Sequence, residues 1–292
     1  MTSTRAALAA LVTCTTALAL MGASAPAPYP PASKGDPWPQ GTVRTVGKLV
    51  AQLPGGQVES CSAAIVDSPS GSVVATAAHC ISSPQRPREP LAMYFQPGYR
   101  GADAAAAGSR AGKGTASGPG RGDGPKNVLA HGWKVASWKT APGWDSGKDL
   151  ESVLPYDWAF LRMHKRGGRT IQDVYGANKL RTEPVRGGAT ATLGYPASAP
   201  YDGETLHYCS GKAHQYRSGE IAEANVGALA LRCRLTQGVS GGPWLRGIDR
   251  ARGAGTLVAV TSVGSDDELL GRPYPRSARA LFKEFGAVHK KG

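Results

Sequence analysis

The sequence has few acidic residues, no CxxC pair of cysteines and almost no segments in which apolar residues recur at helical spacing. Asp and Glu number 21 against 34 Lys and Arg, giving a formal net charge of +13. This excess favours anionic partners, but the basic residues are scattered and no nucleic-acid-binding motif accompanies them, so we expect no nucleic acid partner. Without a CxxC pair a zinc site is disfavoured, and we expect neither a metal nor another cofactor.

Short apolar runs rich in Val, Thr and aromatic residues take the place of helical patterns, and Gly, Pro, Asn and Asp separate them. Many short strands with such punctuation predict an all-β fold, either a sandwich or a barrel. The runs are residues 42–51, 61–66, 72–77, 92–95, 134–138, 158–163, 190–195, 205–208, 228–233 and 256–263.

Only residues 276–289 have the spacing of an amphipathic helix, with apolar residues three and four apart. The sequence therefore predicts a single helix at the C-terminus. Residues 100–126 differ from both patterns, because 15 of these 27 residues are Gly or Ala and none is aromatic. We expect this segment to be a surface insertion.

The N-terminus resembles an export signal. Arg5 precedes an apolar run over residues 6–21 that is short and rich in Thr, and small residues follow it. Residues 1–25 are therefore interpreted as a signal peptide cleaved between Ala23 and Ala27, and proline-rich residues 26–41 as a flexible leader or short propeptide. A lipoprotein anchored at Cys14 is the alternative, although Thr13 is a poor residue before such a cysteine. We expect a secreted, extracellular protein without stable membrane association.

Removal of the signal peptide leaves an even number of cysteines: Cys61, Cys80, Cys209 and Cys233. In an exported chain this number predicts two disulfides. Four cysteines allow three pairings, and the pairs Cys61–Cys80 and Cys209–Cys233 close the shortest loops.

Three motifs suggest chemistry. A histidine, His79, ends an apolar strand in the segment TAAHC at residues 76–80. Asp157 precedes the apolar segment WAFL, where a solvated charge has little reason to lie. Ser240 lies among glycines in GVSGGP at residues 238–243. Glycines let the backbone turn sharply, so that a serine hydroxyl projects and nearby N–H groups face a developing oxyanion. Each motif alone is compatible with an ordinary structural role, but the ordered set is specific.

With these motifs the sequence, from about residue 46 onward, resembles the chymotrypsin-like (trypsin-fold) serine peptidases, in particular the secreted bacterial branch that includes glutamyl endopeptidases. The resemblance implies two antiparallel six-stranded β-barrels with the active site between them, followed by the C-terminal helix. We expect the first barrel at residues 42–165, a linker at 166–177, the second barrel at 178–275, and the helix with a basic tail at 276–292.

The resemblance also implies roles for the motif residues. His79 is the expected general base, Asp157 the carboxylate that orients it, and Ser240 the nucleophile. The backbone N–H groups of Gly238 and Ser240 are expected to form the oxyanion hole. The segment TSVG at residues 261–264 resembles the strand that pairs with substrate, which makes Ser262 and Gly264 candidate substrate-binding residues. The pair Cys61–Cys80 matches the family's disulfide next to the histidine, whereas Cys209–Cys233 is assigned on proximity alone.

Three positions depart from the family's patterns. Val239 stands where trypsin-like zymogens have an aspartate, and no IVGG-like start is present, so activation by a new N-terminus is not expected. Arg234 stands where trypsin has an aspartate, which disfavours cleavage after basic residues. Arg234 either points into the primary pocket and favours acidic substrates, or is a solvated strand residue. Glutamyl endopeptidases usually have a histidine at the position of Thr261.

The sequence thus predicts a monomeric serine endopeptidase that hydrolyses polypeptides through an acyl-enzyme intermediate. The alternative is a catalytically inactive homologue that acts as a secreted binding protein. An α/β-hydrolase esterase fits less well. Residues 238–242 match GxSxG, but the histidine precedes the serine and helical segments are nearly absent.

Overall fold

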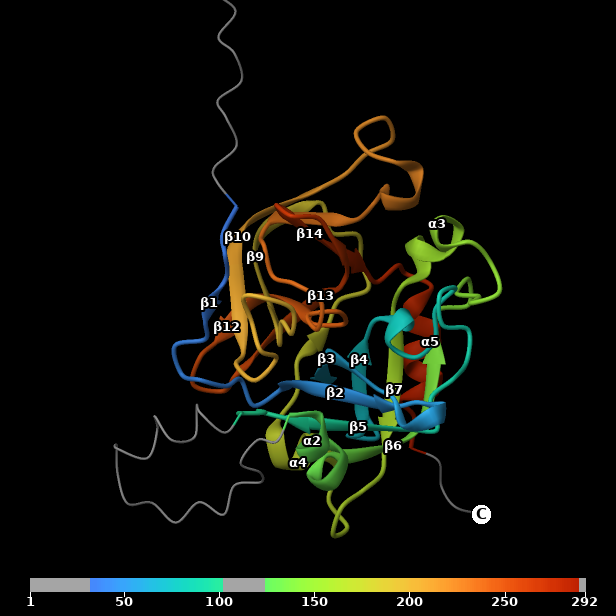
Figure 1. The fold of residues 1–292 in the computed structure, drawn as a ribbon, viewed down its shortest axis with the longest axis vertical. Helices are drawn as coiled ribbons and strands as arrows, with labels where there is room; N and C mark the ends of the chain where they lie inside the picture. The colour runs from blue at the N-terminus through green and yellow to red at the C-terminus, as the bar shows by residue number, and fades with distance from the viewer. Residues whose placement is uncertain (1–31, 102–123, 289–292) are drawn as a thin grey trace, which may run out of the picture. The chain divides into compact units, whose positions relative to one another are not determined.

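The computed structural model of the protein describes residues 32–101 and 124–288. Predictions for the signal peptide, for leader residues 26–31, for insertion residues 102–123 and for residues 289–292 lie outside the described residues. The described chain consists mainly of antiparallel strands joined by short helices (Figure 1). None of the helices in this described part is both long and apolar enough to cross a membrane.

The first barrel is a closed ring of six antiparallel strands in the order β2, β3, β4, β7, β6, β5. The strands are β2 (Val46–Gln52), β3 (Val58–Val66), β4 (Val73–Thr76), β5 (Ala92–Pro97), β6 (Trp133–Thr140) and β7 (Ala159–Met163). All four residues of β4 are buried. Such continuous apolar, β-branched runs form strands that are covered on both faces. β4 is the strand that leads to His79.

The second barrel closes in the same way. Its six strands follow the order β10, β11, β14, β13, β12, β9, and β9 pairs back onto β10. These strands are β9 (Gly187–Gly194), β10 (His207–Gln215), β11 (Leu229–Arg232), β12 (Pro243–Asp249), β13 (Ala254–Gly264) and β14 (Glu268–Pro273). Two short strands extend this sheet: β1 (Asp36–Pro37) pairs with β10, and β8 (Lys179–Leu180) runs parallel to β13. The predicted fold class, two six-stranded antiparallel barrels with a C-terminal helix, is confirmed.

The prediction of a single helix was wrong. Short helices also occur in the connections: α2 (Pro125–His131), α3 (Leu150–Val153), α4 (Ile171–Tyr175), and the 3-10 turns η1 (Pro54–Gly56), η2 (Ala78–Cys80), η3 (Leu154–Tyr156) and η4 (Glu223–Asn225). Local caps account for them without a long apolar repeat. In α4, for example, the Thr170 side chain and the Asp173 carboxylate form a reciprocal capping box.

The C-terminal helix α5 (Ala278–Phe285) is shorter than the predicted range 276–289. Gly286 follows its last residue, and Val288 is 65% exposed rather than part of the apolar face. The helix returns to the first barrel, where it lies beside β7 (Figure 1). The ring of Phe282 packs 5.3 Å from that of Phe160, and Arg162 donates to the carbonyl of Phe285.

One buried apolar cluster contains residues of both barrels, so the two rings share a core. It includes Val46 and Phe160 of the first barrel and Leu193, Leu245 and Val260 of the second. Burial of such side chains contributes about 1.5–3 kcal/mol each relative to exposure. The shared core therefore fixes how the loops of one barrel meet those of the other, which decides the geometry of any site between them.

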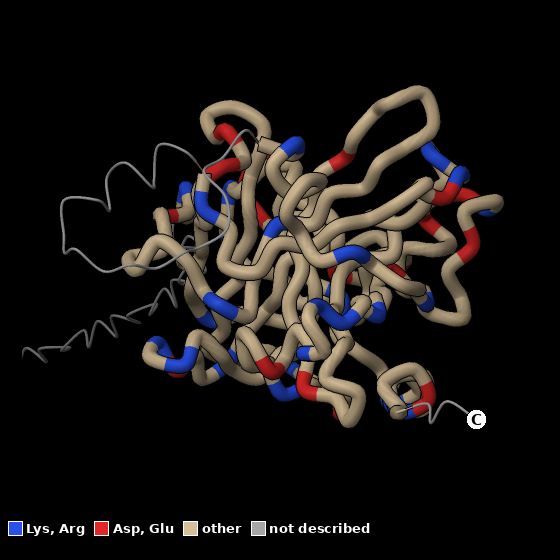
Figure 2. The backbone as a smooth tube through the Cα atoms, turned by 90° about the horizontal axis from the view of Figure 1, so that it is seen from below, with Lys and Arg blue, Asp and Glu red and all other residues tan. Residues whose placement is uncertain are grey.

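Lys and Arg residues lie on many different segments of the backbone and are interspersed with Asp and Glu (Figure 2). The basic residues are thus spread along the described chain and are not gathered on one segment.

Candidate active site

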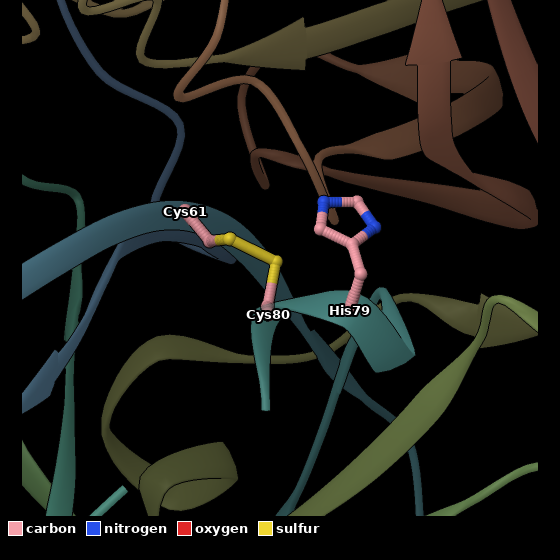
Figure 3. A group of neighbouring side chains, drawn as sticks. All are labelled: Cys61, His79 and Cys80. Carbon is pink, nitrogen blue, oxygen red and sulfur yellow. A yellow bond between two sulfur atoms is a disulfide. The ribbon is translucent and has the colours of Figure 1, made fainter. Parts of the chain in front are cut away.

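His79 lies in the η2 turn directly after β4. The disulfide Cys61–Cys80 joins the residue after His79 to β3. Figure 3 shows the imidazole beside this disulfide. Sulfur and imidazole nitrogen atoms come within 4.8 Å of one another here, but both sulfurs belong to the disulfide, so they are not thiolates that could hold a metal. The disulfide instead ties the histidine turn to the barrel wall.

Asp157 follows the η3 turn and is completely buried. Its Oδ2 lies 2.7 Å from Nδ1 of His79 and accepts a hydrogen bond from the Ser262 hydroxyl at 2.5 Å. Its Oδ1 accepts from the backbone N–H of His79 at 2.9 Å. The carboxylate therefore holds both the ring and the main chain of the histidine, which leaves Nε2 as the nitrogen available for proton transfer.

The two groups shift each other's pKa. Burial by itself would lower the pKa of His79, but the charge and hydrogen bond of Asp157 outweigh it, so the pKa is raised. Burial alone would raise the pKa of Asp157, but His79 and the hydrogen bond from Ser262 outweigh that effect and lower it. The geometry thus favours an ionised carboxylate beside an imidazole that readily accepts a proton.

Ser240 lies in the loop before β12, and this loop packs directly on the first barrel. Its carbonyl accepts a hydrogen bond of 2.8 Å from the N–H of Ser62 on β3. Gly241 approaches so closely that a Cβ there would lie 2.0 Å from Oγ1 of Thr76 and 2.8 Å from the N of Ala77. Ser240 is thereby held against β4, the strand that leads to the His79 turn. Within the described residues its hydroxyl makes no hydrogen bond to the imidazole, a contact that often tightens only when substrate is bound.

Gly238 has φ +99°, a conformation that favours glycine, and a Cβ there would lie 2.4 Å from the carbonyl oxygen of Tyr195. Its own carbonyl accepts a hydrogen bond of 2.8 Å from the Ser62 hydroxyl. Across residues 32–101 and 124–288, the N–H groups of Gly238 and Ser240 have no acceptor. Two unpaired N–H groups at a serine can donate hydrogen bonds to an oxyanion.

A cavity of ≈530 Å³ opens beside Ser240 and is lined by Arg234, Ser262 and Gly264, among others. The predicted nucleophile and all three predicted substrate-binding residues therefore meet at one cavity. On β13, pairing with β12 ends at Val260, and Ser262 lies at an irregularity in the pairing with β14. Beyond Val260, β12 no longer covers this edge of β13, so a peptide could pair there as an added strand.

Arg234 lines this cavity but does not present a free charge. Its Nε and Nη2 lie 2.8 and 2.6 Å from Oδ1 of Asp267, and Arg232 approaches the other oxygen of the same carboxylate at 3.4 Å. The side chains of Arg234 and Asp267 are 48% and 44% exposed. The arginine at the cavity is thus paired and solvated at the same time.

The structure contains both disulfides expected from proximity, Cys61–Cys80 and Cys209–Cys233. Two residues of the site were missed from the sequence. Ser62 binds the carbonyl of Gly238 and the N–H of Tyr195 through one hydroxyl, and no local pattern distinguishes it. Asp267 could have been noticed, because the acidic pair Asp266–Asp267 lies only one residue after the predicted substrate segment.

Comparisons with known proteins place this geometry in context. No protein-family model matches the chain, and no curated protein matches it in sequence. Among solved structures, the chain is similar to the protease Anisep from Arthrobacter nicotinovorans, with a TM-score of 0.65 and 24% identity over 85% of this chain and 98% of that one. It is also similar to AL20, a thermostable serine protease from an extremophilic microorganism, with a TM-score of 0.64 and 25% identity over 85% and 99%.

A third similar structure is a Glu endopeptidase, with a TM-score of 0.54 and 15% identity over 83% of this chain and 90% of that one. The three similarities extend over more than four fifths of the chain. At these identities they establish the fold.

Proposed function

We propose, on the premise that the chain has the trypsin fold of chymotrypsin-like serine peptidases, that it is a secreted serine endopeptidase. The observation that carries the proposal is the set of hydrogen bonds from His79 and Ser262 to the buried carboxylate of Asp157, directly beside the Ser240 loop. A fold alone hosts many functions, so the site has to support the activity.

In the proposed reaction, Oγ of Ser240 attacks the scissile carbonyl carbon as Nε2 of His79 takes the hydroxyl proton. The carbonyl oxygen becomes an oxyanion that accepts hydrogen bonds from the N–H groups of Gly238 and Ser240. His79 then gives its proton to the amide nitrogen, the C–N bond breaks, and the amine leaves an acyl ester on Ser240. Water repeats these steps and releases the carboxylic acid.

Asp157 supports this cycle without exchanging a proton. Its negative charge stabilises the imidazolium that forms in each half-reaction, and its bond to Nδ1 fixes the tautomer. The substrate main chain is expected to pair with β13 next to Ser262 and Gly264. The side chain before the cleaved bond then enters the cavity beside Arg234.

Two features support export. The structure holds two disulfides, which persist in oxidising compartments. The signal-peptide interpretation of residues 1–25 rests on the sequence alone.

Labelling with a fluorophosphonate probe tests the proposal. The chain is expected to form a covalent adduct at Ser240 and to hydrolyse casein, and Ser240→Ala is expected to abolish both. Ser137→Ala is a matched control, because Ser137 is exposed on β6 of the first barrel. A folded chain that forms no adduct would instead support the secreted binding protein.

A further inference from the structure

A second cavity, of ≈310 Å³, lies between the η3 and η4 turns and shares no lining residue with the cavity at Ser240. Four prolines, two valines and a tyrosine form most of its wall. No Asp or Glu lines it, whereas two arginines do, Arg272 and Arg276. The cavity is therefore mostly apolar and positively charged.

Arg272 is the unusual residue of this cavity, because a guanidinium rarely lies buried without a carboxylate partner. Its side chain extends from β14 and the residue is 2% exposed. Nη2 donates to the carbonyl of Ala224 at 2.9 Å and to Oδ1 of Asn225 at 2.5 Å. Nε is buried without a partner, and Nη1 makes no hydrogen bond in the part of the chain that the structure describes.

The guanidinium remains charged at neutral pH. Burial lowers the pKa of Arg272 to about 10, and the charge of Asp157 acts in the opposite direction. Asp157 makes no ion pair with it, since within the described chain no carboxylate oxygen lies within 4.0 Å of this side chain. A buried ion without a counter-ion is costly, and it attracts an anion more strongly than an exposed ion does, because burial excludes the water that would screen the charge.

The hydrogen-bond partners of the guanidinium place it close to the wall of the cavity. Its two partners are residues of η4, and the next two residues, Val226 and Gly227, line the cavity. Pro155 of η3 forms the opposite side. Exposed Arg276 adds a second positive charge at the edge.

We propose that this cavity binds a small carboxylate. The carboxylate accepts a hydrogen bond from Nη1 of Arg272, which has no acceptor in the described chain and, unlike Nε, is not fully buried. The apolar part of the ligand packs against the prolines and valines. The site does not include Ser240 or His79, so this proposal does not depend on whether the chain cleaves peptides.

Titration of the full chain carrying Ser240→Ala tests this site, since that substitution prevents self-digestion. Sodium acetate or sodium butyrate replaces sodium chloride at constant ionic strength, and the NMR shifts of the backbone amides are recorded at each concentration. We expect saturable shifts at Val226 and Gly227, with butyrate binding more tightly than acetate because it buries more apolar surface. Absence of saturation, or shifts confined to Thr236 and Gln237 at the other cavity, would overturn the proposal.

Substitutions in the same background identify the binding group. Arg272→Met retains most of the side-chain volume and removes the charge, and is expected to weaken butyrate binding at least about tenfold. It is expected to fold, because it removes an unpaired buried charge. Arg234→Met removes the cation at the other cavity and is the matched control, with unchanged affinity expected. If Arg272→Met bound butyrate with the same affinity as the chain with Arg272, the assignment would be contradicted. The NMR shifts of the chain with native Arg272 test the location of the site even if Arg272→Met does not fold.

Two sources of the carboxylate can be distinguished with one further comparison. Gly-Val with a free C-terminus and Gly-Val amide are titrated beside butyrate. Binding of butyrate alone assigns the site to a free organic acid, and binding of the peptide acid but not the amide assigns it to a peptide terminus. Equal binding of acid and amide would overturn the role of the carboxylate.

Discussion

Nδ1 of His79 lies 2.7 Å from Oδ2 of Asp157, although 78 residues separate them in the sequence. The same carboxylate accepts hydrogen bonds from the N–H of His79 and from the hydroxyl of Ser262 on the second barrel. One buried group thus joins the histidine turn to the strand expected to bind substrate.

Replacement of Asp157 tests what this group does. Asp157→Asn keeps the size of the side chain but removes its charge. The neutral amide no longer holds His79 in the tautomer that leaves Nε2 free to accept a proton. We expect turnover to fall about 10⁴-fold, measured on a peptide substrate. The control is Asp149→Asn, because Asp149 is exposed and its cap on the N–H of Ser152 survives as Asn. A loss below tenfold at Asp157 would contradict the proposed role.

The pH dependence of activity follows from the raised pKa of His79. The proposed base is the neutral imidazole, so kcat/KM falls as pH falls through that pKa. Because Asp157 raises it, the acid limb should have its midpoint above the ordinary value of 6.5. Removal of the Asp157 charge leaves burial as the main effect, so the His79 pKa in Asp157→Asn should drop. NMR titration of the His79 ring measures both values, and an unchanged value would be inconsistent with this coupling.

Gly241 tests the contact between the Ser240 loop and the first barrel. Its φ is +73°, and a Cβ would lie within 2.5 Å of both Thr76 Oγ1 and the carbonyl oxygen of Ser62. Gly241→Ala should cost more than about 3 kcal/mol or displace Ser240, with loss of activity. Gly247 also has a positive φ, +59°, but open space around it. Gly247→Ala should cost only about 1–2 kcal/mol. The free energy of unfolding in urea and the turnover rate are measured for both variants. Because Gly247→Ala adds backbone strain without a clash, equal effects of the two substitutions would argue against close packing of the Ser240 loop on the first barrel.

The disulfides should matter for stability. Cys61–Cys80 and Cys209–Cys233 join residues 19 and 24 positions apart. Loops of this length correspond to about 3 kcal/mol of lost chain entropy in the unfolded state. Each Cys→Ala double variant should therefore lose about 3 kcal/mol in urea unfolding. A loss under about 1 kcal/mol would mean that the bridge constrains little.

The pair Arg234–Asp267 should modestly weaken the preference for acidic side chains before the cleaved bond. Because both side chains are about half exposed, the ion pair contributes little free energy. Freeing Arg234 from it should therefore change the preference for acidic over neutral side chains by only about two- to fivefold. Asp267→Asn should raise kcat/KM for Glu relative to Ala substrates, and Arg234→Gln should lower it. The pair would be irrelevant to specificity if neither variant changed the ratio.

Much of the fold could be predicted from local sequence. The apolar runs gave the positions of most barrel strands, but β12 and β14 were missed. β12 starts with Pro243 and contains Gly247, and β14 contains Gly271 and the buried Arg272, so neither has a strand-like pattern. Their neighbours in the barrel stabilise them, through pairing that depends on residues far away in the sequence.

The sequence by itself determined which chemical groups are present: His79, Asp157 and Ser240 lie in local motifs, and the spacing of the cysteines favoured the observed bridges. Only the tertiary structure decided what each group contacts. Asp267 pairs with Arg234, and Arg272 is buried beside a cavity without a carboxylate, because barrel closure sets neighbours that no local pattern records. The sequence shows that a charged residue is present, but not whether it is buried or which groups it contacts. Burial and contacts arise on folding, and they determine the pKa of the residue and its chemical role.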